Sequence, residues 1–155
     1  MGYRQDVLRL AARWRELGST GGLVPGHRGR GTPVERGWTS WATFSESFVA
    51  SAWDEYAGAS VLFVPGSEFM VLDVDMKPGK SDGLDSLRRL LADRGIDWPD
   101  QATIPTVQTK SGGRHYYLRL PPSVSLGPSA GSFGVDYPGL DIRSGINSYV
   151  VAPPS

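Results

Sequence analysis

The sequence contains no cysteine among its 155 residues. This absence excludes disulfide bonds, zinc sites built on thiolates and enzymes that use a cysteine nucleophile. It suits a cytoplasmic protein, which is the location we expect. The sequence also lacks any hydrophobic run of the roughly 18 residues that a membrane-spanning helix needs. The arginines near the N-terminus are not followed by the apolar segment of a signal peptide. We therefore expect no membrane partner.

Basic residues are absent from the middle of the chain, although the whole chain has zero net charge. Residues 1–36 carry seven arginines and three acids, whereas residues 37–75 carry six acids and no lysine or arginine. Proteins that bind DNA tightly without regard to its sequence are usually more basic overall. We therefore expect the nucleic-acid affinity of this chain to be modest.

The length and composition suit one domain with a substantial core, so we treat residues 1–155 as a single domain. Apolar residues at helical spacing predict helices over 6–17, 44–56 and 84–94. The last residues, 149–155, read as a strand that runs into a turn. We therefore expect this domain to be part of a longer protein.

The segment Phe69–Asp75 reads as a short apolar strand that ends in two acids. Because side chains alternate along a strand, Asp73 and Asp75 share one face with Val71, and the other face is apolar throughout. Two carboxylates at one strand end repel each other unless a cation or a proton intervenes. They could bind Mg²⁺ or Mn²⁺, although a pair of acids where a strand meets a loop has the same pattern.

Two other stretches contain residues that are typical of turns and loops. Pro65-Gly66 separates the strand at 59–64 from the acidic strand, and this predicts that the two strands form a hairpin. Residues 18–37 form a glycine-rich basic segment without the spacing of a P-loop. We interpret it as a surface loop, with phosphate contact as the alternative.

A second hairpin is predicted over 104–120, with Ser111-Gly112-Gly113 as its turn. His115 and Tyr117 share one face of the returning strand. A short strand at 140–143 similarly places Asp141 and Arg143 opposite its apolar residues. An irregular connection over 121–138 joins the two elements.

An antiparallel sheet with helices on one face would gather these polar side chains over its open face. Three carboxylates suggest a divalent metal site, formed by Asp73, Asp75 and Asp141. The Ser-Gly-Gly turn, with Arg114 and His115, supplies backbone N–H groups and cationic donors for phosphate oxygens. These parts together suit two-metal phosphoryl or nucleotidyl transfer.

Three segments resemble the bifunctional DNA primase/polymerase domain of the archaeo-eukaryotic primase superfamily, which occurs in phage and plasmid replication proteins. They are Val71–Asp75, Thr109–Leu118, and Leu140–Arg143 followed by Tyr149–Ser155. In the N-terminal third the match is looser, because Arg30 stands where that family usually has a lysine.

The resemblance implies an α+β fold, with an RRM-like antiparallel sheet joined to a small N-terminal α/β unit and an active-site cleft between them. It implies a template-directed DNA primase or polymerase that uses two Mg²⁺ or Mn²⁺ ions to add nucleotides to a 3′-hydroxyl, with single-stranded template, primer and dNTP or NTP as partners. It also implies downstream helical accessory and helicase or ATPase domains. The implied site residues are the metal ligands Asp73, Asp75 and Asp141, and the nucleotide-binding residues Ser111, Gly112, Gly113, Arg114, His115 and Arg143.

Other functions remain open at this point. A metal-dependent nuclease would use the same acids, but it would leave the Ser-Gly-Gly-Arg-His turn without a triphosphate to bind. A non-catalytic RRM-like module would need aromatic residues on its sheet face, and the usual RRM pattern is absent. A rolling-circle initiator would need two nearby histidines, whereas His27 and His115 are far apart in the sequence.

Overall fold

The computed structural model describes residues 2–98, 103–127 and 133–155. It confirms a mixture of helices and antiparallel sheets. The helices are α1 (Tyr3–Glu16), the short 3₁₀ helix η1 (Trp38–Ser40), α2 (Glu46–Glu55) and α3 (Gly83–Arg94). The strands are β1 (Gly22–Gly26), β2 (Ser60–Val64), β3 (Gly66–Val74), β4 (Met76–Lys77), β5 (Ser81–Asp82), β6 (Thr106–Gln108), β7 (Arg114–Arg119), β8 (Leu140–Gly145) and β9 (Val150–Ala152).

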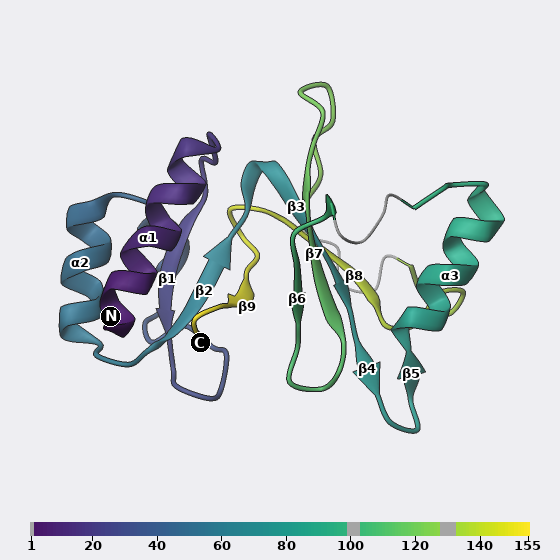
Figure 1. Cartoon of the computed structure of the whole chain (residues 1–155), viewed down its shortest axis with the longest axis horizontal. Helices are drawn as coiled ribbons and strands as arrows, with labels where there is room; N and C mark the ends of the chain where they lie inside the picture. Colours follow the sequence, from purple (N-terminus) through teal and green to yellow (C-terminus); the bar gives the residue numbers. More distant parts are fainter. Residues whose placement is uncertain (1, 99–102, 128–132) are drawn as a thin grey trace.

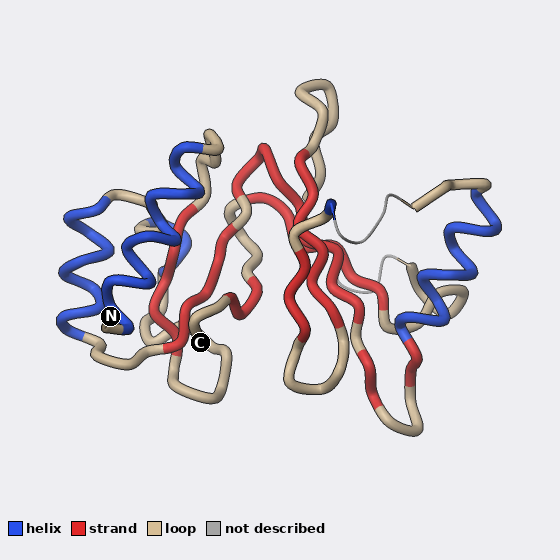
Figure 2. Tube along the Cα trace, viewed as in Figure 1, coloured by secondary structure: helices blue, strands red, loops and turns tan. Residues whose placement is uncertain are grey.

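Two sheets lie side by side between the helices. The first has the strand order β1-β2-β9 and the second the order β6-β7-β3-β8, while β4 and β5 form a small separate ribbon. Helices α1 and α2 lie on the outer side of the first sheet and α3 lies on the outer side of the second (Figures 1 and 2). All strand pairs are antiparallel. The last strand, β9, pairs with β2, so the chain ends in the same sheet as β1.

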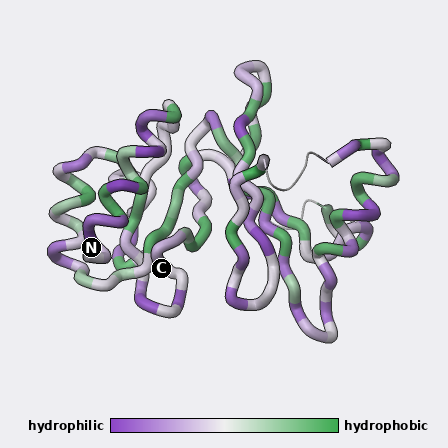
Figure 3. The backbone as a smooth tube through the Cα atoms, in the orientation of Figure 1, coloured by the Kyte–Doolittle hydropathy of each residue, from purple (hydrophilic) through white to green (hydrophobic). Residues whose placement is uncertain are grey.

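The two faces of the second sheet belong to different hydrophobic clusters. Val71 and Tyr117 contact a cluster formed with α1, α2 and the first sheet, whereas Leu72 and Tyr116 belong to a cluster beneath α3. The helices show alternating hydrophilic and hydrophobic bands, as expected for helices with one buried side (Figure 3). Hence one face of β3 packs under α3, and the other, which carries Asp73, turns toward the first sheet.

The predicted hairpin between β2 and β3 is wrong. Pro65 and Gly66 instead lead the chain from the first sheet into the second. β2 and β3 do not pair with each other, because each already has two partners: β2 pairs with β1 and β9, and β3 pairs with β7 and β8. Gly66 has a φ of +74°, and a Cβ atom there would lie 2.5 Å from the backbone nitrogen of Gly21. This crossing point therefore requires glycine.

The prediction of a loop over residues 18–37 is wrong in part. Residues 22–26 form the buried edge strand β1. A Cβ atom at Gly21 would lie 1.9 Å from the carbonyl oxygen of Val64, and one at Gly22 would lie 2.0 Å from the nitrogen of Thr43. These glycines let backbones approach closely rather than giving a mobile loop. Pro25 fits because β1 is an edge strand.

The other elements agree closely with the sequence patterns. Asp82 caps α3 by accepting a hydrogen bond from the Asp85 nitrogen, and Gly95 ends that helix in the left-handed conformation. The hairpin of β6 and β7 forms as predicted. Residues 128–132 of the connection over 121–138 lie outside the described residues. None of the described helices combines the length and apolar character needed to cross a bilayer.

Candidate active site

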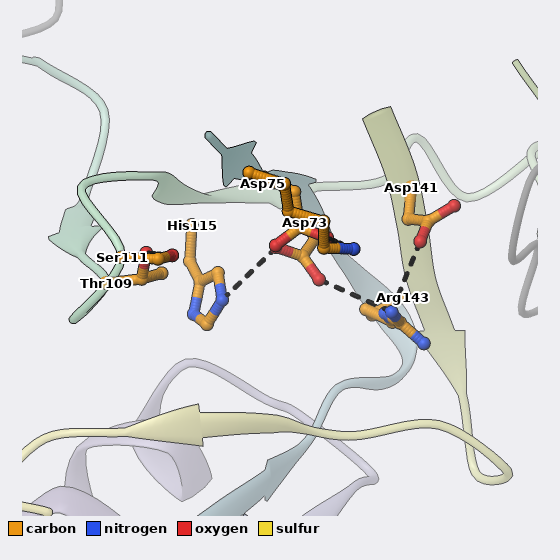
Figure 4. Close-up of polar contacts among 8 residues, drawn as sticks. Asp73, Asp75, Thr109, Ser111, His115, Asp141 and Arg143 are labelled. Atoms are coloured by element: carbon orange, nitrogen blue, oxygen red, sulfur yellow. Dashed lines mark hydrogen bonds and ion pairs between the residues drawn. The ribbon is translucent and has the colours of Figure 1, made fainter. Parts of the chain in front are cut away.

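Asp73 is the central residue of the candidate site because β3 lies between β7 and β8. Its direct cross-strand neighbours are His115 on β7 and Asp141 on β8. Side chains of directly opposed residues lie on the same face of a sheet. The register therefore gathers a carboxylate from each of two strands and an imidazole from a third, as Figure 4 shows.

Cationic and polar groups surround the buried carboxylate of Asp73, which is 9% exposed. The Nε2 atom of His115 lies 3.4 Å from one carboxylate oxygen, and a guanidinium nitrogen of Arg143 lies 3.4 Å from the other. The same nitrogen lies 3.3 Å from Asp141 (Figure 4). Burial raises the pKa of Asp73, but the hydrogen bond and charge of His115 and the charge of Arg143 outweigh it, so the net pKa is lowered.

Asp75 follows the last residue of β3 and forms an ion pair with a neighbour on the β4–β5 ribbon. Its carboxylate lies 2.8 Å from the ammonium nitrogen of Lys77. The hydrogen bond and charge of Asp75 raise the pKa of Lys77. Backbone hydrogen bonds to Gly139 and from Gly83 hold Asp75 at this position. The second predicted carboxylate thus has an exposed cation beside it.

The donor atoms at this site suit a hard divalent cation, since Mg²⁺ and Mn²⁺ prefer carboxylate oxygens. In the described ranges, however, no three acidic or histidine side chains are grouped closely enough to hold a metal ion. Arg143 and Lys77 instead offset part of the negative charge of the three aspartates. A metal bound at these carboxylates would therefore compete with the two cations for carboxylate oxygens.

The Ser-Gly-Gly turn is held against the end of β3. The Thr109 nitrogen donates to the Gly113 carbonyl, and the Thr109 and Ser111 hydroxyl oxygens are 3.1 Å apart. A Cβ atom at Gly113 would lie 2.2 Å from the Val74 carbonyl oxygen, whereas one at Gly112 would meet no atom within 4 Å. Gly113 is therefore needed to pack the turn on β3, and only Gly112 leaves open space at the surface.

A pocket of about 1130 Å³ has walls that come from both sheets. Four of the predicted site residues line it, namely Asp73, Asp75, Ser111 and His115. Asp141 and Arg143 do not line it, but Arg143 contacts Asp73, which does, and Asp141 contacts Arg143. The structure thus brings the predicted phosphate-binding turn and two of the predicted acids into one cavity.

Arg114 is the predicted site residue that the structure places apart from the others. It is directly opposite Val74, and Val74 belongs to the cluster beneath α3. Because side chains alternate along β7, Arg114 lies on the face opposite to that of His115. It also does not line the pocket. Its predicted role in nucleotide binding has no support from this geometry.

Tyr117 shares the face of His115 but cannot act as a base at neutral pH. Burial, and then the negative charge of Asp73, raise the pKa of its phenol well above the ordinary value. Its ring packs against Trp14 and Phe63. Tyr117 is therefore part of the core that supports the site.

The pocket also contains residues outside the predicted site. Lys110 precedes Ser111 on the hairpin wall, and the segment Arg28–Gly31 lies on the wall formed by the first sheet. Ser155 also lines the pocket, and its hydroxyl accepts a hydrogen bond from the Val61 nitrogen at 2.7 Å. For residues 28–31 the sequence offered two signals: the basic glycine-rich composition, and the position of Arg30 where the resembled family usually has a lysine.

The chain matches a known protein-family model. The model described as bifunctional DNA primase/polymerase, N-terminal, matches residues 17–155. A search of curated proteins found no match. The matched segment includes all the candidate site residues and leaves out only residues 1–16, which contain the whole of α1.

Proposed function

Because the chain belongs to the bifunctional DNA primase/polymerase N-terminal domain family, we propose that it is a template-directed polymerase or primase that adds nucleotides to a 3′-hydroxyl. Family membership by itself implies nucleotidyltransferase activity of this general kind and, in general, the use of divalent metals. We further propose a role in phage or plasmid replication. The proposal also includes helical accessory and helicase or ATPase domains elsewhere in a longer protein.

One observation carries this proposal: a single pocket is lined by Asp73, Asp75, Ser111 and His115. Nucleotidyl transfer needs a cation-binding centre next to a group that holds the triphosphate. The carboxylates supply the first part, and the turn at residues 109–113 supplies the second. We assign the active-site cleft to this pocket between the two sheets.

Asp73, Asp75 and Asp141 are the residues that would hold one or two Mg²⁺ or Mn²⁺ ions. When bound, such ions lower the pKa of a hydroxyl nucleophile and neutralise charge on the departing pyrophosphate. Asp73 is suited to this role because His115 and Arg143 outweigh the effect of burial on its pKa, so the buried carboxylate stays ionised at neutral pH. Arg143 and Lys77 hold the carboxylates in place by ion pairing.

Ser111 and His115 would bind the phosphates of the incoming nucleotide. The Ser111 hydroxyl is fixed near Thr109 at the open tip of the turn, where the open space at Gly112 leaves room for a ligand. Arg143, once it leaves Asp73 and Asp141, would offer a planar set of donors to phosphate oxygens. We propose that His115 binds phosphate and does not act as the general base.

The strand order of the second sheet supports the RRM-like part of the proposal. Its first strand in the chain, β3, and its third, β7, are the central pair, while β6 and β8 are the edges. This is the arrangement of an RRM-like sheet, here with α3 as the one described helix that covers it. The face that an RRM uses for bases carries acids, which would repel phosphates in the absence of a cation.

A primer-extension assay tests the proposal. A labelled primer on a single-stranded template is incubated with dNTPs and Mn²⁺ or Mg²⁺, using the wild type and the variant Asp73→Asn/Asp75→Asn. Extension by the wild type alone supports the proposal. Shortening of the labelled strand would favour a nuclease, and strand binding without any change in length would favour a binding module.

A further inference from the structure

The segment Arg28–Gly31, which follows β1, forms part of the pocket wall opposite the hairpin of β6 and β7. Arg28 and Arg30 both line the pocket that contains Asp73 and His115. The charge of Arg28 reaches the phenol of Tyr3, another lining residue, where it opposes the effect of burial on the pKa of that phenol. Two guanidinium groups thus stand at the far side of the cavity from the Ser-Gly-Gly turn.

The backbone of this segment is fixed by its own hydrogen bonds and by packing. The His27 nitrogen donates to the Thr32 carbonyl at 2.7 Å, and the Arg30 nitrogen donates to the His27 carbonyl at 3.0 Å. A Cβ atom at Gly31 would lie 2.8 Å from a methyl carbon of Val151, so the segment lies directly on β9. The two arginines are therefore presented at a defined place.

Neither Arg28 nor Arg30 has a carboxylate partner within the described ranges, although many other arginines of the chain do. Both side chains are exposed at the mouth of the pocket. Exposed, unpaired cations beside glycines are available to a polyanion whose backbone approaches closely. The charge of the arginines is thus free for an external ligand.

We infer that Arg28 and Arg30 bind the phosphate backbone of a single nucleic-acid strand and hold it across the pocket from the nucleotide-binding turn. The identity of that strand as template or primer rests on the proposed function. The opposite wall already provides Ser111, His115 and Lys110 for a triphosphate, so the arginines suit a second anionic ligand. In a chain with zero net charge, strand binding needs such a local concentration of positive charge.

The test measures binding of a labelled single-stranded oligonucleotide by fluorescence anisotropy at several salt concentrations. It uses EDTA and no nucleotide, so neither metal nor catalysis is involved. The variant is Arg28→Gln/Arg30→Gln. The matched control is Arg88→Gln/Arg94→Gln, which removes two exposed charges from α3, on the outer side of the second sheet (Figure 1). Circular dichroism verifies that all three proteins are folded.

The slope of log K against log salt is negative, and loss of two phosphate contacts reduces its magnitude by about 1.4 for a single strand. Between about 50 and about 200 mM salt, the affinity of the variant should therefore fall about sevenfold less than that of the wild type. The control should keep the wild-type slope. Equal slopes for the variant and the wild type would overturn the inference, as would absence of strand binding by the wild type at low salt.

A second experiment tests whether the two arginines bind the strand or the triphosphate. Binding of a labelled dNTP with Mn²⁺ should be the same in the wild type and in Arg28→Gln/Arg30→Gln. Reduced dNTP affinity with an unchanged strand slope would assign the arginines to the triphosphate and overturn the inference. A wild type that fails to extend primers, yet shows the slope difference, would refute the proposed function and leave the strand site standing.

Discussion

Asp73 and His115 are direct cross-strand partners on β3 and β7, with 3.4 Å between the His115 Nε2 atom and a carboxylate oxygen of Asp73. Both line the large pocket. His115 therefore contacts the central acid and also faces the cavity that the proposed phosphate-binding turn lines. The first prediction concerns this histidine.

The variant His115→Ala should lose nucleotide affinity more than turnover. Removal of a charge-assisted hydrogen bond to phosphate should raise the dissociation constant of a dNTP by about tenfold or more. Calorimetric titration with a non-hydrolysable dNTP and Mn²⁺ measures this constant. The matched control is His27→Ala, which removes the other histidine of the chain. Unchanged affinity together with lost turnover would instead make His115 a general base.

The variant Arg143→Gln should bind Mn²⁺ more tightly than the wild type does when no nucleotide is present. Arg143 contacts both Asp73 and Asp141, so it competes with a metal for the same oxygens. A partly buried ion pair of this kind is worth about 1 kcal/mol, and its removal should raise Mn²⁺ affinity about fivefold. Arg114→Gln, on the opposite face, is the control. Equal or weaker Mn²⁺ binding by Arg143→Gln would contradict the competition.

The contribution of Asp73 to stability should depend on pH. Its folded-state pKa lies below the ordinary value of 3.8, so the ionised form is favoured by folding. This stabilisation is present above the unfolded-state pKa and is lost as the pH falls through the folded-state value. Urea unfolding without metal, from about pH 7 to about pH 3, should therefore show the stability difference between wild type and Asp73→Asn shrinking in acid. A constant or growing difference would contradict this, and the exposed Asp136→Asn is the control.

The variant Gly113→Ala should destabilise the fold, because its Cβ atom would lie 2.2 Å from the Val74 carbonyl oxygen. Overpacking against backbone costs about 2 kcal/mol or more in the free energy of unfolding. The same change at Gly127, where a Cβ atom meets nothing within 4 Å, should be close to neutral. Urea unfolding curves compare the two. Similar stabilities would show that the turn can move away from β3.

The sequence predicted the helices and the faces of the strands because both follow from local periodicity. Asp73, His115 and Asp141 were each placed on a polar face by simple alternation, and the structure keeps them there. The register that makes them neighbours could not be predicted, since it depends on the pairing of segments at 66–74, 114–119 and 140–145. The ion pair between Arg143 and Asp73 depends on that register.

The errors came from features that depend on distant partners. Pro65-Gly66 has the composition of a hairpin turn, but the sequence does not show that β2 and β3 each pair with other strands on both sides. Gly21 and Gly22 have the composition of a loop. The close backbone contacts with Val64 and Thr43 that require glycine there could not be predicted, because those residues are far away in the sequence. The approach of residues 28–31 to the site likewise depends on how the first sheet faces the second.

The most direct test of the account is single-nucleotide incorporation on four primed templates that differ only in the first templating base. Each template is offered one dNTP at a time with Mn²⁺, and both primer length and released pyrophosphate are measured. The account predicts that the complementary dNTP is added with one equivalent of pyrophosphate, and that Asp73→Asn abolishes both while still binding the strand. Addition that ignores the template base, or shortening of the primer without pyrophosphate, would contradict a template-directed nucleotidyltransferase centred on Asp73.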